Sequence, residues 1–192
     1  MNGVSREDAW TLLCRHTKGD SLRKHGLAVE AVMRHRAHAA GLDPAVVLEW
    51  AITGMLHDFD YEADPAGHPQ NGRPILEAAG LPAHIVRAIE SHGDHTGVSR
   101  DSALEKTLYA VDELSGFVTA VALVRPSRAV RDVDAGAVRR KMKDKAFARS
   151  IDREMMVRGA EALGVPFDDL IADVVSALSS AADQLGLAGS AA

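Results

Sequence analysis

The segment "GMLHDFDYEADPAGHPQNG", residues 54–72, contains side chains that suit metal chemistry. His57 and Asp58 end an apolar helical run, and His68 follows just before a proline. Neutral imidazole together with carboxylate suits a divalent ion such as Mn, Fe, Ni or Zn. Adjacent helical residues point about 100° apart, so both face one ion only if that ion lies over the helix end. Further ligands must then come from other elements.

Two other residues match this requirement. His25 shares a predicted helix face with Val29 and Val32, which turns it toward the core. Asp112 lies in the apolar context "LYAVDELSG", where an unpaired carboxylate is costly to bury and a bound cation removes that cost. The alternatives are a core histidine with an ordinary hydrogen bond and an aspartate paired with a buried arginine. The predicted metal ligands from three helices are His25, His57, Asp58 and Asp112.

The elements that must position these residues are helices. Alternating strand patterns are almost absent, aromatic residues make up only 4%, and helical periodicity recurs, so we expect an all-α fold. Asp20 is a predicted N-cap, and Pro44 takes the favoured first position of the third helix. The helices are expected at about 5–16, 21–40, 44–58, 69–79, 82–92, 102–124, 134–147, 150–163 and 167–186.

The length of 192 residues favours one domain over residues 1–187. Its core is expected at about 20–125, its C-terminal helices at 134–186, and a disordered tail at 188–192. The net charge of −5 argues against bulk affinity for nucleic acid. No apolar run is long enough for a membrane span or a signal peptide, and the single Cys14 fits a reducing cytosol. We expect a cytoplasmic protein, and the sequence leaves assembly into a homo-oligomer open.

The order of His, then His-Asp, then Asp on successive helices resembles the HD superfamily of metal-dependent phosphohydrolases. The similar segments are "LRKHGLAVEAVMRHRAHAAGLDPAVVLEWAITGMLHDFDYE" and "YAVDELSGFVTAVALVRPSR". The chain is most similar to a bacterial branch of predicted HD hydrolases (HDIG-type) that shares "HDxDYE" and "HPxxG", and the resemblance covers about residues 10–175. It implies an HD-domain helical bundle that hydrolyses a small phosphate ester, such as a nucleotide, with a water activated by Mn, Fe, Ni, Co, Mg or Zn.

The resemblance also implies roles for two further histidines. His68 in "HPQNG" and His92 in "IESHGD" match positions that hold a second ion in two-metal relatives, with Asp58 as the bridge. Such relatives carry His-His where this chain reads His92-Gly93, which leaves the second site one ligand short. With one ion, His68 or His92 is a candidate to protonate the leaving oxygen, while Asp58 orients the water. If these histidines have no role in metal binding or catalysis, His68 is expected to cap a helix, and His92 is expected to interact favourably with the dipole at the C-terminal end of its helix.

Basic residues near the C-terminal half are candidates to hold a substrate phosphate, although a solvated helix face is the plainer interpretation. Asp60 and Glu62 are predicted to orient His57 or His68, and Tyr61 either stacks on a base or packs. The candidate phosphate-binding residues are Arg125, Lys143 and Arg149.

Two other functions stay open at this stage. One is a catalytically silent HD module that binds a nucleotide or a protein partner. The other is a di-iron HD oxygenase, which requires a complete second metal site.

Overall fold

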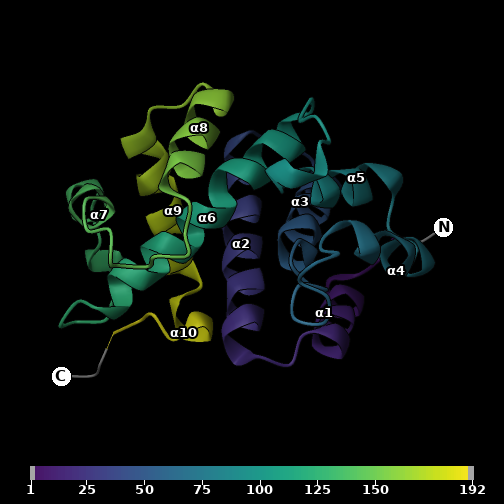
Figure 1. Ribbon diagram of the computed structural model, residues 1–192, viewed down its shortest axis with the longest axis horizontal. Helices are drawn as coiled ribbons and strands as arrows, with labels where there is room; N and C mark the ends of the chain where they lie inside the picture. The colour runs from purple at the N-terminus through teal and green to yellow at the C-terminus, as the bar shows by residue number, and fades with distance from the viewer. Residues whose placement is uncertain (1–2, 190–192) are drawn as a thin grey trace. The chain divides into compact units, whose positions relative to one another are not determined.

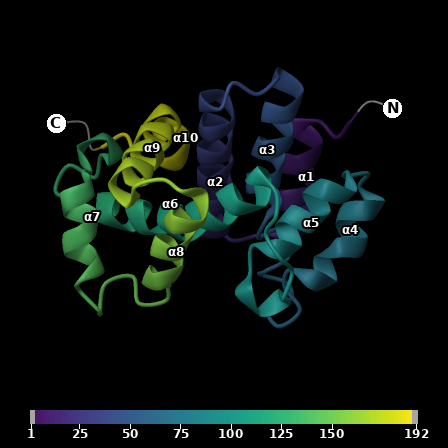
Figure 2. The same cartoon turned by 90° about the horizontal axis from the view of Figure 1, so that it is seen from above.

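A computed structural model describes residues 3–189 and confirms the all-α fold. The described residues form ten α-helices and three 3-10 turns, without a β-sheet (Figures 1 and 2). They divide into two compact units, residues 1–109 and 110–192, and α6 passes from the first into the second. The helices are α1 Arg6–His16, α2 Asp20–Ala39, α3 Pro44–Leu56, α4 Arg73–Ala78, α5 Ala83–Ser91, α6 Ala103–Leu123, α7 Ala135–Met142, α8 Arg153–Leu163, α9 Phe167–Ser180 and α10 Ala182–Leu185. The 3-10 turns are η1 Gln70–Gly72, η2 Asp94–Thr96 and η3 Val130–Asp132.

In the first unit, α2 and α3 lie side by side along much of their length (Figures 1 and 2). Two glycines make this close packing feasible. A Cβ on Gly26 would lie 2.7 Å from the carbonyl oxygen of Met55, and one on Gly54 would lie 2.8 Å from that of Val29. Both separations are shorter than real side chains tolerate, so each helix needs glycine at the crossing. The crossing therefore determines how close His25, beside Gly26, lies to His57, which follows Gly54 at the end of α3.

The start of α2 differs by one residue from the sequence prediction. Gly19 is the N-cap, so no side chain caps the helix from that position, and Asp20 is the first helical residue. The carboxylate of Glu62 accepts hydrogen bonds from the backbone N–H groups of Lys18 and Gly19, at 3.0 Å for the latter. These hydrogen bonds lower the pKa of Glu62. Through these hydrogen bonds, Glu62 links the turn before α2 to the loop after α3.

That loop, residues 57–69, is compact because several of its side chains are buried. Phe59 is fully buried, and its carbonyl oxygen accepts a hydrogen bond of 2.8 Å from the hydroxyl of Thr17. Gly72 leaves space for Asp60, since a Cβ there would lie 2.5 Å from Asp60 Oδ2. The loop is thereby held against α1 and η1, and its acidic and histidine side chains have fixed positions.

The second unit contains α7 to α10 and the last part of α6. Buried residues recur along one face of α9 at helical spacing, and α9 packs against α7, α8 and η3. The helix predicted at 134–147 ends earlier, at Met142, because residues 143–152 fold as turns. The guanidinium of Arg153 donates to the carbonyl oxygens of Met142 and Ile151 and holds these turns.

The end of the chain is also described in part. The helix predicted at 167–186 is interrupted at Ala181, whose φ of −110° and ψ of 12° separate α9 from α10. Ala188, the first residue of the predicted tail, forms an isolated antiparallel β-bridge with Ala129. The rest of that tail from residue 190 onward lies outside the described residues. None of the helices within residues 3–189 has both the length and the apolar character needed to cross a membrane.

Candidate metal centre

The first group of ligand atoms comes from α2 and the end of α3. His57 is the C-cap of α3 and fully buried, and its Nε2 lies 3.2 Å from Nε2 of His25 on α2. Asp58 Oδ2 lies 3.3 Å from His57 Nε2 and 3.6 Å from His25 Nε2. The α2–α3 crossing produces this approach, because Gly26 follows His25 directly and Gly54 lies one turn before His57. The three side chains offer ligand atoms close enough to hold one ion.

The second group uses the other oxygen of the same aspartate. Asp58 Oδ1 lies 3.1 Å from Nε2 of His68 and 3.5 Å from Nε2 of His92. His68 comes from the loop after α3, and His92 is the C-cap of α5. The rings of His57 and His92 contact each other edge to face, with centroids 5.2 Å apart. Asp58 thus lies between two pairs of imidazoles, with one oxygen toward each pair.

Hydrogen bonds at the outer ring nitrogens determine which nitrogen faces inward. Nδ1 of His57 donates to the carbonyl oxygen of Gly54 at 2.8 Å, and Nδ1 of His92 donates to that of Ile89 at 2.5 Å. A carbonyl oxygen only accepts, so Nδ1 carries the hydrogen in both rings. In the neutral rings, Nε2 then presents a lone pair toward Asp58. This is the tautomer that binds a metal through Nε2.

His68 is oriented in the same way by an acid. Its Nδ1 lies 2.7 Å from Oδ1 of Asp60, so Nε2 again points inward. His68 Nε2 and His92 Nε2 lie 3.2 Å apart, and both carry lone pairs when the rings are neutral. Such a pair is repulsive unless a proton or a cation lies between the two atoms. The donor set therefore fits a divalent metal ion.

The charges of the site shift the pKa values of two residues strongly. Burial raises the pKa of Asp58, but the positive charge of His57 and the hydrogen bonds that His57, His68 and His92 donate when they are protonated outweigh it, so the pKa stays well below its usual range. Burial lowers the pKa of His68, but hydrogen bonds and charge attraction from Asp58 and Asp60 outweigh it and raise the pKa to about 9. Asp58 is thus anionic, and the region favours positive charge.

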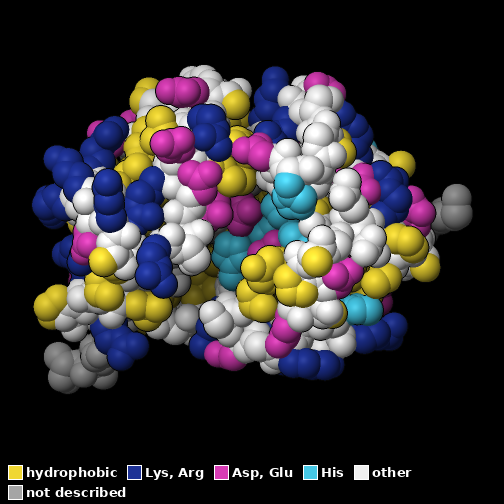
Figure 3. Space-filling view, in the orientation of Figure 1, with side chains coloured by type: hydrophobic (Ala, Val, Ile, Leu, Met, Phe, Trp, Pro, Cys, Tyr) yellow, Lys and Arg dark blue, Asp and Glu magenta, His cyan; other side chains and the backbone are white. Residues whose placement is uncertain are grey.

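Solvent reaches part of the site. The side chains of His25 and Asp58 are each 21% exposed, while His57 is fully buried. Figure 3 shows histidine side chains that reach the surface close together on this face. Tyr61 is 45% exposed, and its ring contacts that of His68 edge to face at 5.3 Å. A small molecule that reaches Asp58 and Tyr61 would meet both the histidine and aspartate cluster and an aromatic ring.

The structure brings five predicted site residues together in the first unit: His25, His57, Asp58, His68 and His92. Asp112 lies on α6 in the second unit, three residues after the boundary, with its side chain buried. Arg125, Lys143 and Arg149 also belong to the second unit, and the latter two are exposed. The functional roles predicted for all these residues stay predictions.

Some contributors were not identified from the sequence. Gly26 and Gly54 stand inside predicted helices beside the histidines, and an isolated glycine in a helical pattern often marks close backbone approach. That signal was available in the sequence. His95 is not among the predicted ligands, and its Nε2 lies 2.9 Å from the carbonyl oxygen of His68, where it supports the loop.

An all-helical chain with such a histidine and aspartate cluster is compatible with an HD domain. Compared with models of known protein families, with curated proteins and with solved structures, the chain matches none.

Proposed function

We propose that this protein is a metal-dependent phosphohydrolase that acts on a small phosphate ester. The observation that supports it best is the position of Asp58, whose two carboxylate oxygens lie toward two separate pairs of histidine Nε2 atoms. A bridging carboxylate of this kind suits two divalent ions in one site. The resemblance to the HD superfamily points in the same direction.

In this proposal His25, His57 and Asp58 would hold one ion, and Asp58, His68 and His92 would hold another. A divalent ion bound there would polarise a phosphoryl oxygen and would lower the pKa of a water molecule to near neutrality. Asp58 contacts the histidines of both groups and so holds the two groups next to each other. Its low pKa keeps the carboxylate anionic at neutral pH, as a ligand must be.

Asp112 remains the sequence-based candidate for a further acidic ligand. Tyr61 supports the choice of a nucleotide-like substrate, because its ring is exposed beside His68 and aromatic rings stack on bases. The substrate that we propose is therefore a phosphate ester that carries a planar group.

The test combines metal content with hydrolysis. The protein as purified and after reconstitution with Mn²⁺ would be assayed on p-nitrophenyl phosphate, bis-p-nitrophenyl phosphate and a panel of nucleotides. We expect hydrolysis that a chelator removes and that Asp58→Asn and Asp112→Asn lower at least about a hundredfold. His84→Ala is the matched control, since His84 is exposed and pairs with Glu49 away from the cluster. Metal uptake without hydrolysis of any ester would overturn the enzyme proposal and favour a silent binding module.

A di-iron oxygenase is the second candidate, and the same observation favours it, because Asp58 faces two histidine pairs. The oxygenase, unlike the phosphohydrolase, requires iron and O₂. Visible absorption of the iron-loaded protein together with O₂ consumption would select this function, whereas Mn²⁺-supported ester hydrolysis without O₂ uptake would select the phosphohydrolase.

A further inference from the structure

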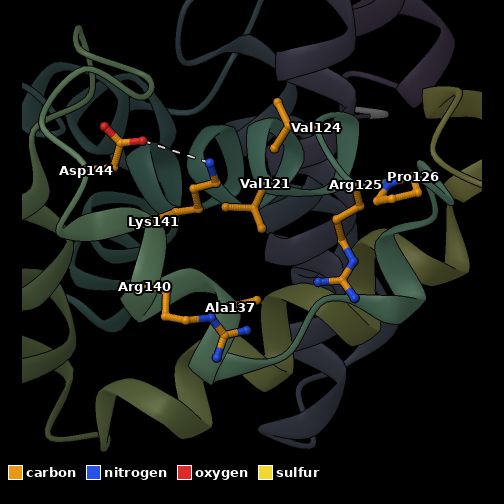
Figure 4. Close-up of a pocket in the computed structure, with 8 residues that line it drawn as sticks. All are labelled: Val121, Val124, Arg125, Pro126, Ala137, Arg140, Lys141 and Asp144. Carbon is orange, nitrogen blue, oxygen red and sulfur yellow. Dashed lines mark ion pairs between the residues drawn. The ribbon is translucent and has the colours of Figure 1, made fainter.

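A cavity in the second unit contains none of the candidate metal ligands and takes no part in the proposed hydrolysis. It has a volume of about 490 Å³ and is lined by the end of α6, by α7 and by the turn after α7 (Figure 4). Val121 on α6 lines the cavity together with Val124 and Arg125 in the turn that follows this helix, and on α7 the lining residues include Arg140 and Lys141.

The charged groups of the cavity are mostly cations. Arg125, Arg140 and Lys141 line it together with one acid, Asp144, so three positive charges face one negative charge. Asp144 is largely engaged elsewhere, because its Oδ1 accepts hydrogen bonds from the backbone N–H groups of Ala146 and Phe147. Its other oxygen lies 3.9 Å from Lys141 Nζ, which is a weak ion pair. The cavity therefore carries an excess of two positive charges.

One of these cations has a buried donor without a partner. Nε of Arg125 is inaccessible to solvent, and no acceptor among the described residues lies within hydrogen-bond distance. Figure 4 shows the guanidinium groups of Arg125 and Arg140 among the lining groups. Because Nε of Arg125 is closed to solvent, a ligand oxygen would meet this guanidinium at its terminal nitrogens, which are not among the buried donors without a partner.

The remaining wall of the cavity is apolar. Val124 is 56% exposed, and the adjoining Leu123 is 41% exposed, although both are aliphatic. Val121 is buried at the base of the same face. A ligand that combines an anionic head with a short hydrocarbon chain would pair with the cations and cover Val124 at the same time.

We propose that this cavity is a binding site for a phosphate monoester or phosphonate that carries a short apolar chain. The net positive charge of two matches a phosphate dianion, and guanidinium groups bind its oxygens with charge-assisted hydrogen bonds. Arg125 and Arg140 supply guanidinium donors, Lys141 supplies further charge, and the two valines contact the chain. This binding needs neither the metal centre nor the hydrolysis proposed there.

The test is calorimetric titration of the full chain with hexylphosphonate, whose carbon–phosphorus bond is not a substrate for ester hydrolysis. We expect saturable binding that Arg125→Gln weakens at least about tenfold and Arg140→Gln several-fold. Arg131→Gln removes the same charge from an exposed side chain outside the cavity and should change the affinity less than about twofold. Inorganic phosphate should bind at least about tenfold more weakly than hexylphosphonate, because it lacks the chain.

A second measurement keeps the proposal testable if Arg125→Gln destabilises the protein. In ¹H–¹⁵N spectra of the unaltered protein, the Arg125 Nε–H signal should shift on titration with hexylphosphonate. Equal affinity of Arg125→Gln, Arg140→Gln and Arg131→Gln would mean general charge attraction and would overturn the proposal. So would hexanol binding as tightly as hexylphosphonate, or an Arg125 signal that does not move.

Discussion

The Nε2 atoms of His68 and His92 lie 3.2 Å apart, although the Nδ1 hydrogen of each ring is already donated to a fixed acceptor. In neutral rings both Nε2 atoms carry lone pairs, so their approach is favourable only with a cation or a proton between them. The chain enforces this approach through two elements that are distant in sequence, the loop after α3 and the end of α5. The fold therefore favours a positive charge between the Nε2 atoms of His68 and His92.

The first prediction concerns the number of ions. We expect the reconstituted protein to hold two equivalents of a divalent metal and His92→Ala to hold one, because that change leaves only Asp58 and His68 from the second group. Elemental analysis after gel filtration measures the stoichiometry. His84→Ala should behave as the unaltered protein, since its imidazole is 55% exposed and outside the cluster. An unchanged stoichiometry in His92→Ala would contradict the two-ion arrangement.

The second prediction concerns the acid behind His68. Asp60 Oδ1 accepts the Nδ1 hydrogen of His68 at 2.7 Å, whereas its buried Oδ2 has no hydrogen-bond partner among the described residues. Asp60→Asn removes the negative charge that fixes the tautomer, and loss of such a contact lowers metal affinity about 10–100-fold. Titration with Mn²⁺ measures the change.

The control for this prediction is Asp64→Asn in the same loop. Asp64 accepts hydrogen bonds from Asn71 and from the backbone N–H of Gly67, not from a histidine. It should change the Mn²⁺ affinity less than about threefold if orientation of His68 is the cause. Equal losses in both variants would show that loop stability, rather than the Asp60–His68 contact, determines the affinity.

The third prediction concerns the glycine crossing of α2 and α3. A Cβ at residue 26 would lie 2.7 Å from the carbonyl oxygen of Met55, so Gly26→Ala forces the helices apart. Overpacking of this kind lowers the free energy of unfolding by about 1–3 kcal/mol. We also expect weaker binding of the first ion, because His25 and His57 separate. Urea unfolding and Mn²⁺ titration measure the two effects.

Gly3→Ala is the matched control, because no atom lies within 4 Å of a Cβ built there. It should leave both the free energy of unfolding and the metal affinity close to those of the unaltered protein. A stable Gly26→Ala variant with unchanged affinity would contradict the role of the crossing.

Much of this arrangement could be predicted because it depends on local pattern. Apolar periodicity indicated the helices, and the adjacency of His57 and Asp58 indicated the first candidate ligands. The tautomers could not be predicted, because the acceptors at Gly54 and Ile89 become defined only when each histidine caps its helix. The true start of α2 was missed for a similar reason, since Glu62 supplies its cap from 43 residues away.

The last prediction concerns stability in acid, and it rests on Glu105 at the start of α6. Its carboxylate accepts hydrogen bonds from the backbone N–H groups of Asp101 and Ser102 at 2.7 and 2.8 Å and pairs with Arg87. The residue is only 3% exposed. Burial raises the pKa of Glu105, but these hydrogen bonds and the Arg87 contact outweigh it and leave the pKa below the ordinary 4.5. The ionised carboxylate is therefore the form that the fold favours.

A lowered pKa in the folded state gives stability that is fully present above the unfolded value and is lost as the pH falls through the folded value. We expect Glu105→Gln to lower the free energy of unfolding by about 1–3 kcal/mol near neutral pH. This difference should shrink as the pH falls below 4.5, where the unaltered protein begins to lose the same contribution. Urea unfolding over a pH series measures it, with the exposed Glu7→Gln as the control. A difference that stays constant down to strongly acidic pH would mean that Glu105 acts through packing alone and not through its charge.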